Sequence, residues 1–205
     1  MKHINGYEQI YLDLAADLAG FDLVGNASHL GLRVVEGGVG LRFLGRDYQV
    51  SARGVEVLDG RPVSFNHLSL AAHYAMSPGR GEPSGQFLPL RRLTGLVEGQ
   101  GAYDRDGLSR PLIKKFGSDR ASLEAAIDSL EGCPAGPDPS GGLAWLFQPF
   151  PKVALKLIHH PADEEFPAEY QLRFDSSATR FMAFEALGFL AGVFVQDLCA
   201  GGPLG

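Results

Sequence analysis

The segment from residue 182 to residue 199 carries apolar side chains around nearly its whole circumference as far as Gln196. A helix with one side in water shows a continuous polar stripe at the helical period, and this segment has none before that residue. Most of its surface must therefore be covered by the rest of the chain. We expect a buried, apolar C-terminal helix, and the alternative is that its outer face forms a homodimer.

Two groups of alternating apolar residues supply the layers that can cover this helix. Residues 32–57 hold three or four short alternating segments separated by glycines, which predict an antiparallel meander. Together with the helical spacing elsewhere, they predict an α+β fold with mainly antiparallel sheets, an N-terminal meander plus C-terminal strands, packed with four to five helices. The expected helices are residues 7–18, 64–76, 110–116, 119–130 and 182–199, and the expected later strands are residues 87–90, 143–147, 153–158 and 170–174.

The length of 205 residues favours a single domain over residues 1–205. Residues 132–142 contain three prolines and four glycines, which predicts an irregular connector. This connector is the one place where we expect a subdomain boundary.

The charge and the cysteine content exclude several classes of partner. Lysine and arginine total 18 against 24 aspartate and glutamate, a net charge of −6, so we expect no nucleic-acid partner and no membrane partner. The N-terminus lacks the apolar stretch of a secretory signal, and we expect a cytoplasmic protein. Two cysteines, Cys133 and Cys199, are too few for a disulfide framework or for a metal cluster held by this chain alone.

The common catalytic motifs are missing from the sequence. There is no Walker loop, no GxGxxG, no HExxH, no CxxC and no GxSxG elbow. Any chemistry must therefore come from residues that are dispersed along the chain.

Arginines are concentrated in the loop-rich middle of the chain. Guanidinium groups bind carboxylates and phosphates bidentately, so a small anionic ligand is one interpretation, and pairing with nearby acidic residues is the other. Which cofactor, if any, the protein binds stays open. The five arginines are Arg80, Arg91, Arg92, Arg105 and Arg110.

The densest polar cluster runs from His159 and His160 to the acidic residues Asp163, Glu164 and Glu165. Imidazole and carboxylate suit a divalent metal, but neighbouring residues of a strand point to opposite faces and do not easily share one ion. We therefore predict no metal site and favour a solvated acidic loop.

Six short phrases of the sequence form an ordered set: residues 44–50 (LGRDYQV), 73–74 (HY), 90–93 (LRRL), 111–117 (PLIKKFG), 163–168 (DEEFPA) and 174–175 (FD). In this order they resemble the domain-of-unknown-function family 3786. The resemblance implies anaerobic bacteria or archaea, a setting in anaerobic redox or one-carbon metabolism, and an iron-sulphur or corrinoid protein as partner. It also directs attention to five polar residues on matching positions: His73, Arg91, Asp163, Glu165 and Asp175.

Three functions stay open at this point. The favoured one is an accessory domain that binds a small anionic ligand, a cofactor or a redox partner through a cleft lined by His73, Arg91 and residues 163–165. The second is an enzyme in which Asp163 or Glu165 acts as general base and His73 as acid, with or without a metal. The third is a structural homodimer.

Overall fold

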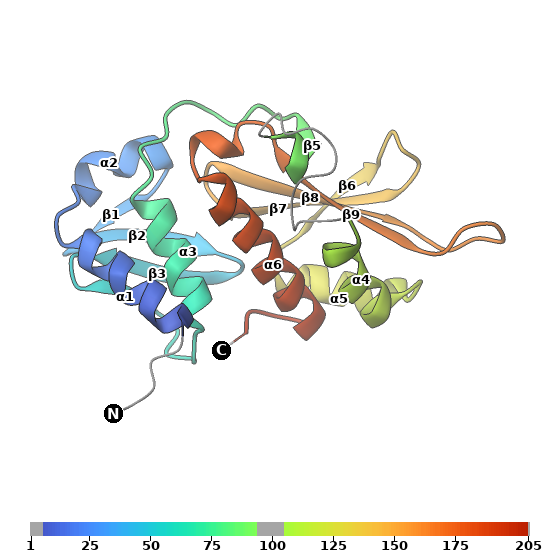
Figure 1. Ribbon diagram of the computed structural model, residues 1–205, viewed down its shortest axis with the longest axis horizontal. Helices are drawn as coiled ribbons and strands as arrows, with labels where there is room; N and C mark the ends of the chain where they lie inside the picture. Colours follow the sequence, from blue (N-terminus) through green and yellow to red (C-terminus); the bar gives the residue numbers. More distant parts are fainter. Residues whose placement is uncertain (1–5, 94–104, 205) are drawn as a thin grey trace.

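The first half of the chain folds through contacts between neighbouring segments. Four strands follow one another as a meander in the order β1-β2-β3-β4, all antiparallel, and α3 lies over them (Figure 1). The turn between β2 and β3 is made by Leu44 and Gly45, both with positive φ, as a two-residue hairpin requires. The elements are α1 (Gly6–Leu18), α2 (Leu23–Leu30), β1 (Arg33–Val35), β2 (Gly38–Phe43), β3 (Arg46–Ser51), β4 (Gly54–Val57) and α3 (Phe65–Ala75).

The second half builds a five-stranded antiparallel sheet whose order is not the order of the sequence. Its strands run β5-β9-β8-β7-β6, so β5 is placed at one edge by pairing with the last strand of the chain. The computed structural model describes residues 6–93 and 105–204. The elements are β5 (Phe87–Pro89), the short 3-10 helix η1 (Leu90–Arg92), α4 (Arg105–Phe116), α5 (Arg120–Ser129), β6 (Cys133–Pro137), β7 (Leu143–Phe150), β8 (Val153–His160), β9 (Glu169–Asp175), the 3-10 helix η2 (Ala178–Arg180) and α6 (Phe184–Ala200).

The C-terminal helix α6 is buried, and the prediction from its apolar circumference is confirmed. It packs against α3, α4 and α5 (Figure 1), and Phe194 meets Phe147 of β7 edge to face at 4.7 Å between ring centroids. The α+β class and the two antiparallel sheets are confirmed as well. The homodimer through the outer face of α6 stays a prediction.

A stack of three aromatic rings joins the two sheets. Phe150 of β7 stacks on Phe43 of β2 at 4.6 Å and on Tyr74 of α3 at 4.4 Å between ring centroids. The Tyr74 hydroxyl donates to the Leu30 carbonyl at 2.7 Å and accepts from the Lys152 amide at 3.0 Å. All three rings are fully buried, so the halves share one core.

One expectation about an element is wrong in part, and one helix was not predicted. Cys133–Pro137, within the expected irregular connector, pairs with β7 as an edge strand with a register shift between Pro134 and Gly136. Proline is tolerated at an edge, where its missing N–H leaves no ladder bond unmade. The helix α2 was not predicted, since its eight residues are too few to show a period.

None of the helices within the described residues combines the length and the apolar character needed to cross a bilayer.

Candidate functional site

A hollow of about 400 Å³ lies where β5 and η1 meet α4 and β9, and we call it the arginine-lined hollow. Pockets that bind small molecules typically measure roughly 300 to 1,000 Å³. Its wall is formed by Phe87, Leu88, Pro89, Leu90, Arg91, Arg92, Leu108, Ser109, Leu112, Tyr170, Gln171, Leu172 and Arg173.

The hollow exists because β5 is short. It pairs only with Arg173–Asp175 of β9, and after Pro89 the chain turns into η1. The outer edge of β9 before Arg173 therefore has no partner strand among the described residues. The α4 helix covers part of this edge, where the Ser109 hydroxyl accepts a hydrogen bond from the Tyr170 amide at 3.3 Å. The space left between η1, α4 and β9 is the hollow.

The inner wall is apolar and the outer parts carry positive charge. Leu90 and Leu112 are buried in the wall, while Arg91 and Arg92 of η1 are exposed at the surface. Arg92 forms no ion pair with any residue in 6–93 or 105–204. An apolar chamber with guanidinium groups at its opening can hold a molecule that has an anionic head and an apolar body.

Arg173 brings a third guanidinium to the hollow. Its Nη2 donates to the Gln171 side chain at 2.8 Å and its Nη1 lies 3.8 Å from Asp138, yet its buried Nε has no hydrogen-bond partner within the described residues. Asp138 is shared with Lys156 at 2.8 Å. Burial opposes ionisation of Asp138, but hydrogen bonds from Lys156 and Ser140 hold the pKa of this carboxyl well below its usual range. The single buried carboxylate of Asp138 thus lies next to two cations, so positive charge exceeds negative charge among these three side chains.

Asp175, one of the predicted ligand-binding residues, is engaged in holding the hollow together. Its carboxylate is buried and accepts from the amide and hydroxyl of Ser84, the amide of Gly85, and the amide and hydroxyl of Ser177, at 2.5 to 2.9 Å. Burial opposes ionisation, but these hydrogen bonds lower the pKa of Asp175. The residue fastens the loop before β5 to the end of β9.

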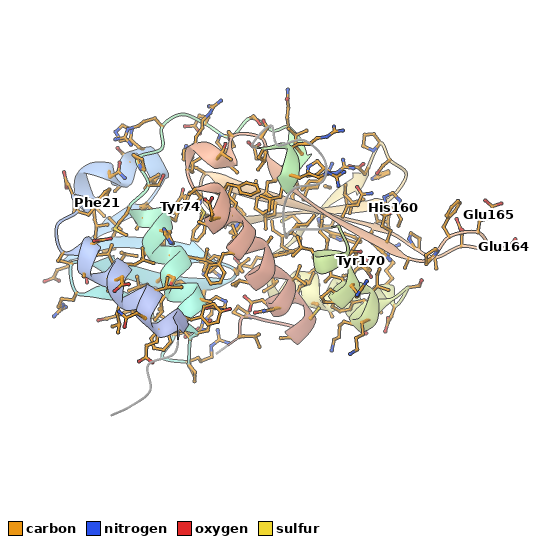
Figure 2. The ribbon with its side chains drawn as sticks, viewed as in Figure 1. Phe21, Tyr74, His160, Glu164, Glu165 and Tyr170 are labelled. Atoms are coloured by element: carbon orange, nitrogen blue, oxygen red, sulfur yellow. The ribbon has the colours of Figure 1, made fainter. Side chains whose placement is uncertain are left out.

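Asp163 and Glu165 lie on the connection between β8 and β9, which projects beyond the body of the molecule; Figure 2 shows Glu164 and Glu165 at its far end. The Asp163 carboxylate accepts from the amides of Glu165 and Phe166 at 2.9 and 2.7 Å, and these backbone bonds lower its pKa. The side chains of Glu165 and Phe166 are exposed. This connection is a turn that Asp163 stabilises locally.

His73 lies on α3 at the edge of a different hollow, whose wall includes Met76, Arg180 and Met182. Partial burial by these walls lowers the pKa of His73 although its ring still reaches solvent. Among the five predicted residues, only Arg91 lines the arginine-lined hollow. The single cleft of His73, Arg91 and residues 163–165 is not formed, and neither is an acid-base pair between His73 and the acidic turn.

The two adjacent histidines of β8 have separate surroundings. His159 is buried and stacks on Tyr170 at 4.5 Å between ring centroids, while His160 lies 3.4 Å from the Ser140 hydroxyl. Neither ring nitrogen of His159 has a hydrogen-bond partner in the described structure. Burial is the larger influence on His159, and it lowers the pKa of the ring. The nearby Gly117 carbonyl acts in the opposite direction, but it already accepts a hydrogen bond from the Tyr170 hydroxyl at 2.9 Å.

A second group of polar residues was not predicted from the sequence. The Oγ atom of Ser64, at the start of α3, lies 2.6 Å from Nδ1 of His67. On the other side of the ring, Nε2 of His67 lies 2.7 Å from Oδ2 of Asp197 in α6. Ser64 and His67 are three residues apart at the start of a helix, and this spacing in the sequence could have predicted a contact between their side chains. Asp197 comes from 130 residues further along, and only the packing of α6 on α3 brings it there.

A model of the domain of unknown function DUF3786 matches residues 22–197, which is most of the chain. The chain therefore belongs to this family, as the resemblance of its phrases indicates. Comparisons with the curated proteins and with the solved structures gave no match.

Proposed function

We propose that this member of the DUF3786 family binds a small amphipathic anion in the arginine-lined hollow. The observation that supports the proposal is the arrangement of Arg91, Arg92 and Arg173 around an apolar chamber of about 400 Å³. Guanidinium groups match the planar geometry of carboxylate and phosphate, and they keep their charge at every physiological pH.

The wall also limits the kind of ligand. Leu90, Leu108, Leu112 and Leu172 offer aliphatic contacts, so the body of the ligand is apolar and small enough for the chamber. The unpaired Nε of Arg173 is a donor in need of an acceptor. A carboxylate or phosphate head that reaches it gains a charge-assisted hydrogen bond and removes a buried unsatisfied group.

We place this binding protein in the cytoplasm, as an accessory to the anaerobic redox or one-carbon metabolism that the family resemblance implies. Its two cysteines, one exposed and one half-buried, cannot hold a cluster by themselves. An iron-sulphur or corrinoid group would therefore belong to a partner protein.

The test uses a fluorescent amphipathic anion, 8-anilinonaphthalene-1-sulfonate, titrated into the folded protein. We expect Arg92→Ala to weaken binding by about fivefold to tenfold, because one charge-assisted hydrogen bond at an exposed site is worth about 1 kcal/mol. Arg53→Ala, which removes an exposed arginine from the turn between β3 and β4, is the matched control and should leave the affinity unchanged.

Competition identifies the chemical class. Octanoate and octyl phosphate should displace the dye, whereas octyl glucoside, which has the same chain and no charge, should displace it much less. Equal affinity of the Arg92→Ala and Arg53→Ala variants for the dye, or equal displacement by the neutral glucoside, would contradict the proposal.

A further inference from the structure

We propose that Ser64 is an activated nucleophile that takes acyl groups from small esters, with His67 as its general base and Asp197 as the residue that positions His67. This site is separate from the arginine-lined hollow and does not depend on the function proposed there. The three side chains form one continuous line of hydrogen bonds, 2.6 Å from Ser64 to His67 and 2.7 Å from His67 to Asp197.

The carboxylate of Asp197 sets the protonation pattern of the ring. Its Oδ2 faces Nε2 of His67, and its Oδ1 accepts the amide of Leu204 at 3.0 Å. The carboxylate accepts a hydrogen bond from Nε2–H of His67, and in the neutral ring, which is the form that acts as a base, Nδ1 is then an acceptor. The Ser64 hydroxyl therefore donates to Nδ1. Serine proteases use the opposite nitrogens for the two contacts, but the order of nucleophile, base and orienting carboxylate is the same.

Helix capping alone does not account for this arrangement. Ser64 caps α3 by accepting from the His67 amide, at a long 3.4 Å, while its shortest contact is the one to the ring. The residues behind it, His67 and Asp197, are 1% and 0% exposed. Taking an imidazole and a carboxylate out of water is costly, and a cap needs neither group.

The loop that leads to Ser64 is fixed by a buried arginine. Arg46 is 3% exposed and forms two hydrogen bonds to the Asp59 carboxylate, at 2.9 and 2.6 Å. It also donates to the carbonyls of Arg61 and Pro62, both at 2.9 Å. The backbone just before Ser64 is thus held in place, as a reactive side chain requires.

The surroundings of Ser64 also suit a developing negative charge. The amides of Phe65 and Asn66, in the first turn of α3, have no hydrogen-bond acceptor within the described residues, and they lie at the positive end of the helix. Ser64 itself is only half-buried. We therefore expect small, exposed acyl groups such as acetyl as substrates.

The reaction proceeds in two balanced steps. Oγ of Ser64 attacks the carbonyl carbon of the ester while its proton moves to Nδ1 of His67, and the oxyanion that forms is held by the two free amides. The bond to the alcohol then breaks, and the proton on Nδ1 goes to the departing oxygen. Water hydrolyses the acyl-serine through the same base, which restores Ser64 and releases the acid.

A fluorophosphonate probe tests the reactivity of Ser64 in the full-length protein, because serine oxygen displaces fluoride from phosphorus by the same proton transfer. We expect one adduct, found by peptide mass spectrometry on Ser64, that forms at least about 100-fold faster than any adduct on the exposed Ser28, given the usual contribution of a general base. In parallel, p-nitrophenyl acetate should be hydrolysed with an initial burst of one nitrophenol per chain.

Matched variants separate the reactive role from the structural one. Ser64→Asn keeps a helix-capping oxygen and removes the nucleophile, so it should fold as the native chain does and lose both the adduct and the burst. His67→Gln keeps a polar group but cannot take the proton, and the adduct on Ser64 should form at the rate of the Ser28 adduct. An unlabelled Ser64 in the native chain, or a burst that survives Ser64→Asn, overturns the proposal. The affinity for 8-anilinonaphthalene-1-sulfonate should be unchanged in Ser64→Asn, so failure here leaves the proposed function standing.

Discussion

The two sheets of this protein are both antiparallel, but they are assembled in different ways. The N-terminal sheet pairs each strand with the next one in the sequence, whereas the C-terminal sheet takes its edge strand β5 from a point between the two halves and pairs Phe87 with Asp175 (Figure 1). The first sheet also has a short edge strand, β1, but this strand is joined to its neighbour β2 by a tight turn. The second sheet has an edge that β5 covers only in part, and the arginine-lined hollow lies at that edge. A sheet completed by a short, distant segment leaves room for a ligand where the segment ends.

The largest expected effect comes from Phe150→Ala, which tests whether the two halves are energetically one unit. The ring of Phe150 belongs to the second half, is fully buried, and stacks on Phe43 and Tyr74 of the first half. Removing it should lower the free energy of unfolding by about 3 to 5 kcal/mol, as measured by urea denaturation. Hydrogen exchange should then show faster opening in both sheets. Faster exchange in the C-terminal sheet alone would mean that the halves are independent.

A smaller effect is expected from Asp175→Asn, which acts only on the second half. The amide that replaces the carboxylate cannot accept all the bonds from Ser84, Gly85 and Ser177, so we expect a loss of about 2 to 3 kcal/mol. Hydrogen exchange should accelerate most around β5 and much less in the meander. Glu56→Ala, an exposed carboxylate on β4, is the control and should change stability by less than about 0.5 kcal/mol.

Acidic pH should weaken the second half through His159. Burial lowers the pKa of His159 in the folded protein, so below pH about 6.5 the unfolded chain takes up a proton that the folded chain does not. Stability should therefore fall as the pH drops below that value, by at most about 1.4 kcal/mol at pH 5.5. His159→Phe should flatten this part of the stability curve, measured by urea denaturation from pH 7.5 to 5.5. The control is His73→Gln at an exposed histidine, which should flatten the stability curve less. If His73→Gln flattens the curve as much as His159→Phe does, or more, the loss of stability at acidic pH does not come from His159.

The smallest effect is expected at an exposed ion pair between the halves. Arg42 of β2 binds Glu131, which follows α5, and the hydrogen bonds from Arg42 lower the pKa of this carboxyl. Both side chains are about half exposed, so Glu131→Gln should cost only about 0.5 kcal/mol. The difference between native and variant thermal midpoints should vanish in 1 M salt. A difference that persists in salt would show that Glu131 acts through packing.

The sequence predicts elements well where the contacts that form them are local. The helix over residues 7–18, the meander and the C-terminal helix each have their own period, and the structure agrees with them. The edge strand Cys133–Pro137 was missed because its prolines and glycine resemble a loop, and only pairing with β7 makes it a strand. The strand order of the second sheet could not be predicted from the sequence for the same reason, because Phe87 of β5 pairs with Asp175 of β9, 88 positions later in the chain.

Much less of the candidate site could be predicted. Arg91 was identified by the excess of arginine in the middle of the chain, but Ser109 and Tyr170 take part only because α4 packs against the open edge of β9. Asp175 was selected as a ligand-binding residue, and the structure shows a carboxylate whose acceptor capacity is used by the amides and hydroxyls of Ser84, Gly85 and Ser177. The line from Ser64 to Asp197 depends entirely on two helices meeting.

The position of α6 in the chain also matters while the protein is being made. Both sheets and α3 are translated before α6, yet α6 packs on Phe147 of the second sheet and on α3. Until α6 has left the ribosome, those apolar surfaces lack this part of their cover, and exposed apolar surfaces are prone to aggregate. Production of this protein should therefore respond more strongly to the supply of chaperones than its final stability alone would indicate.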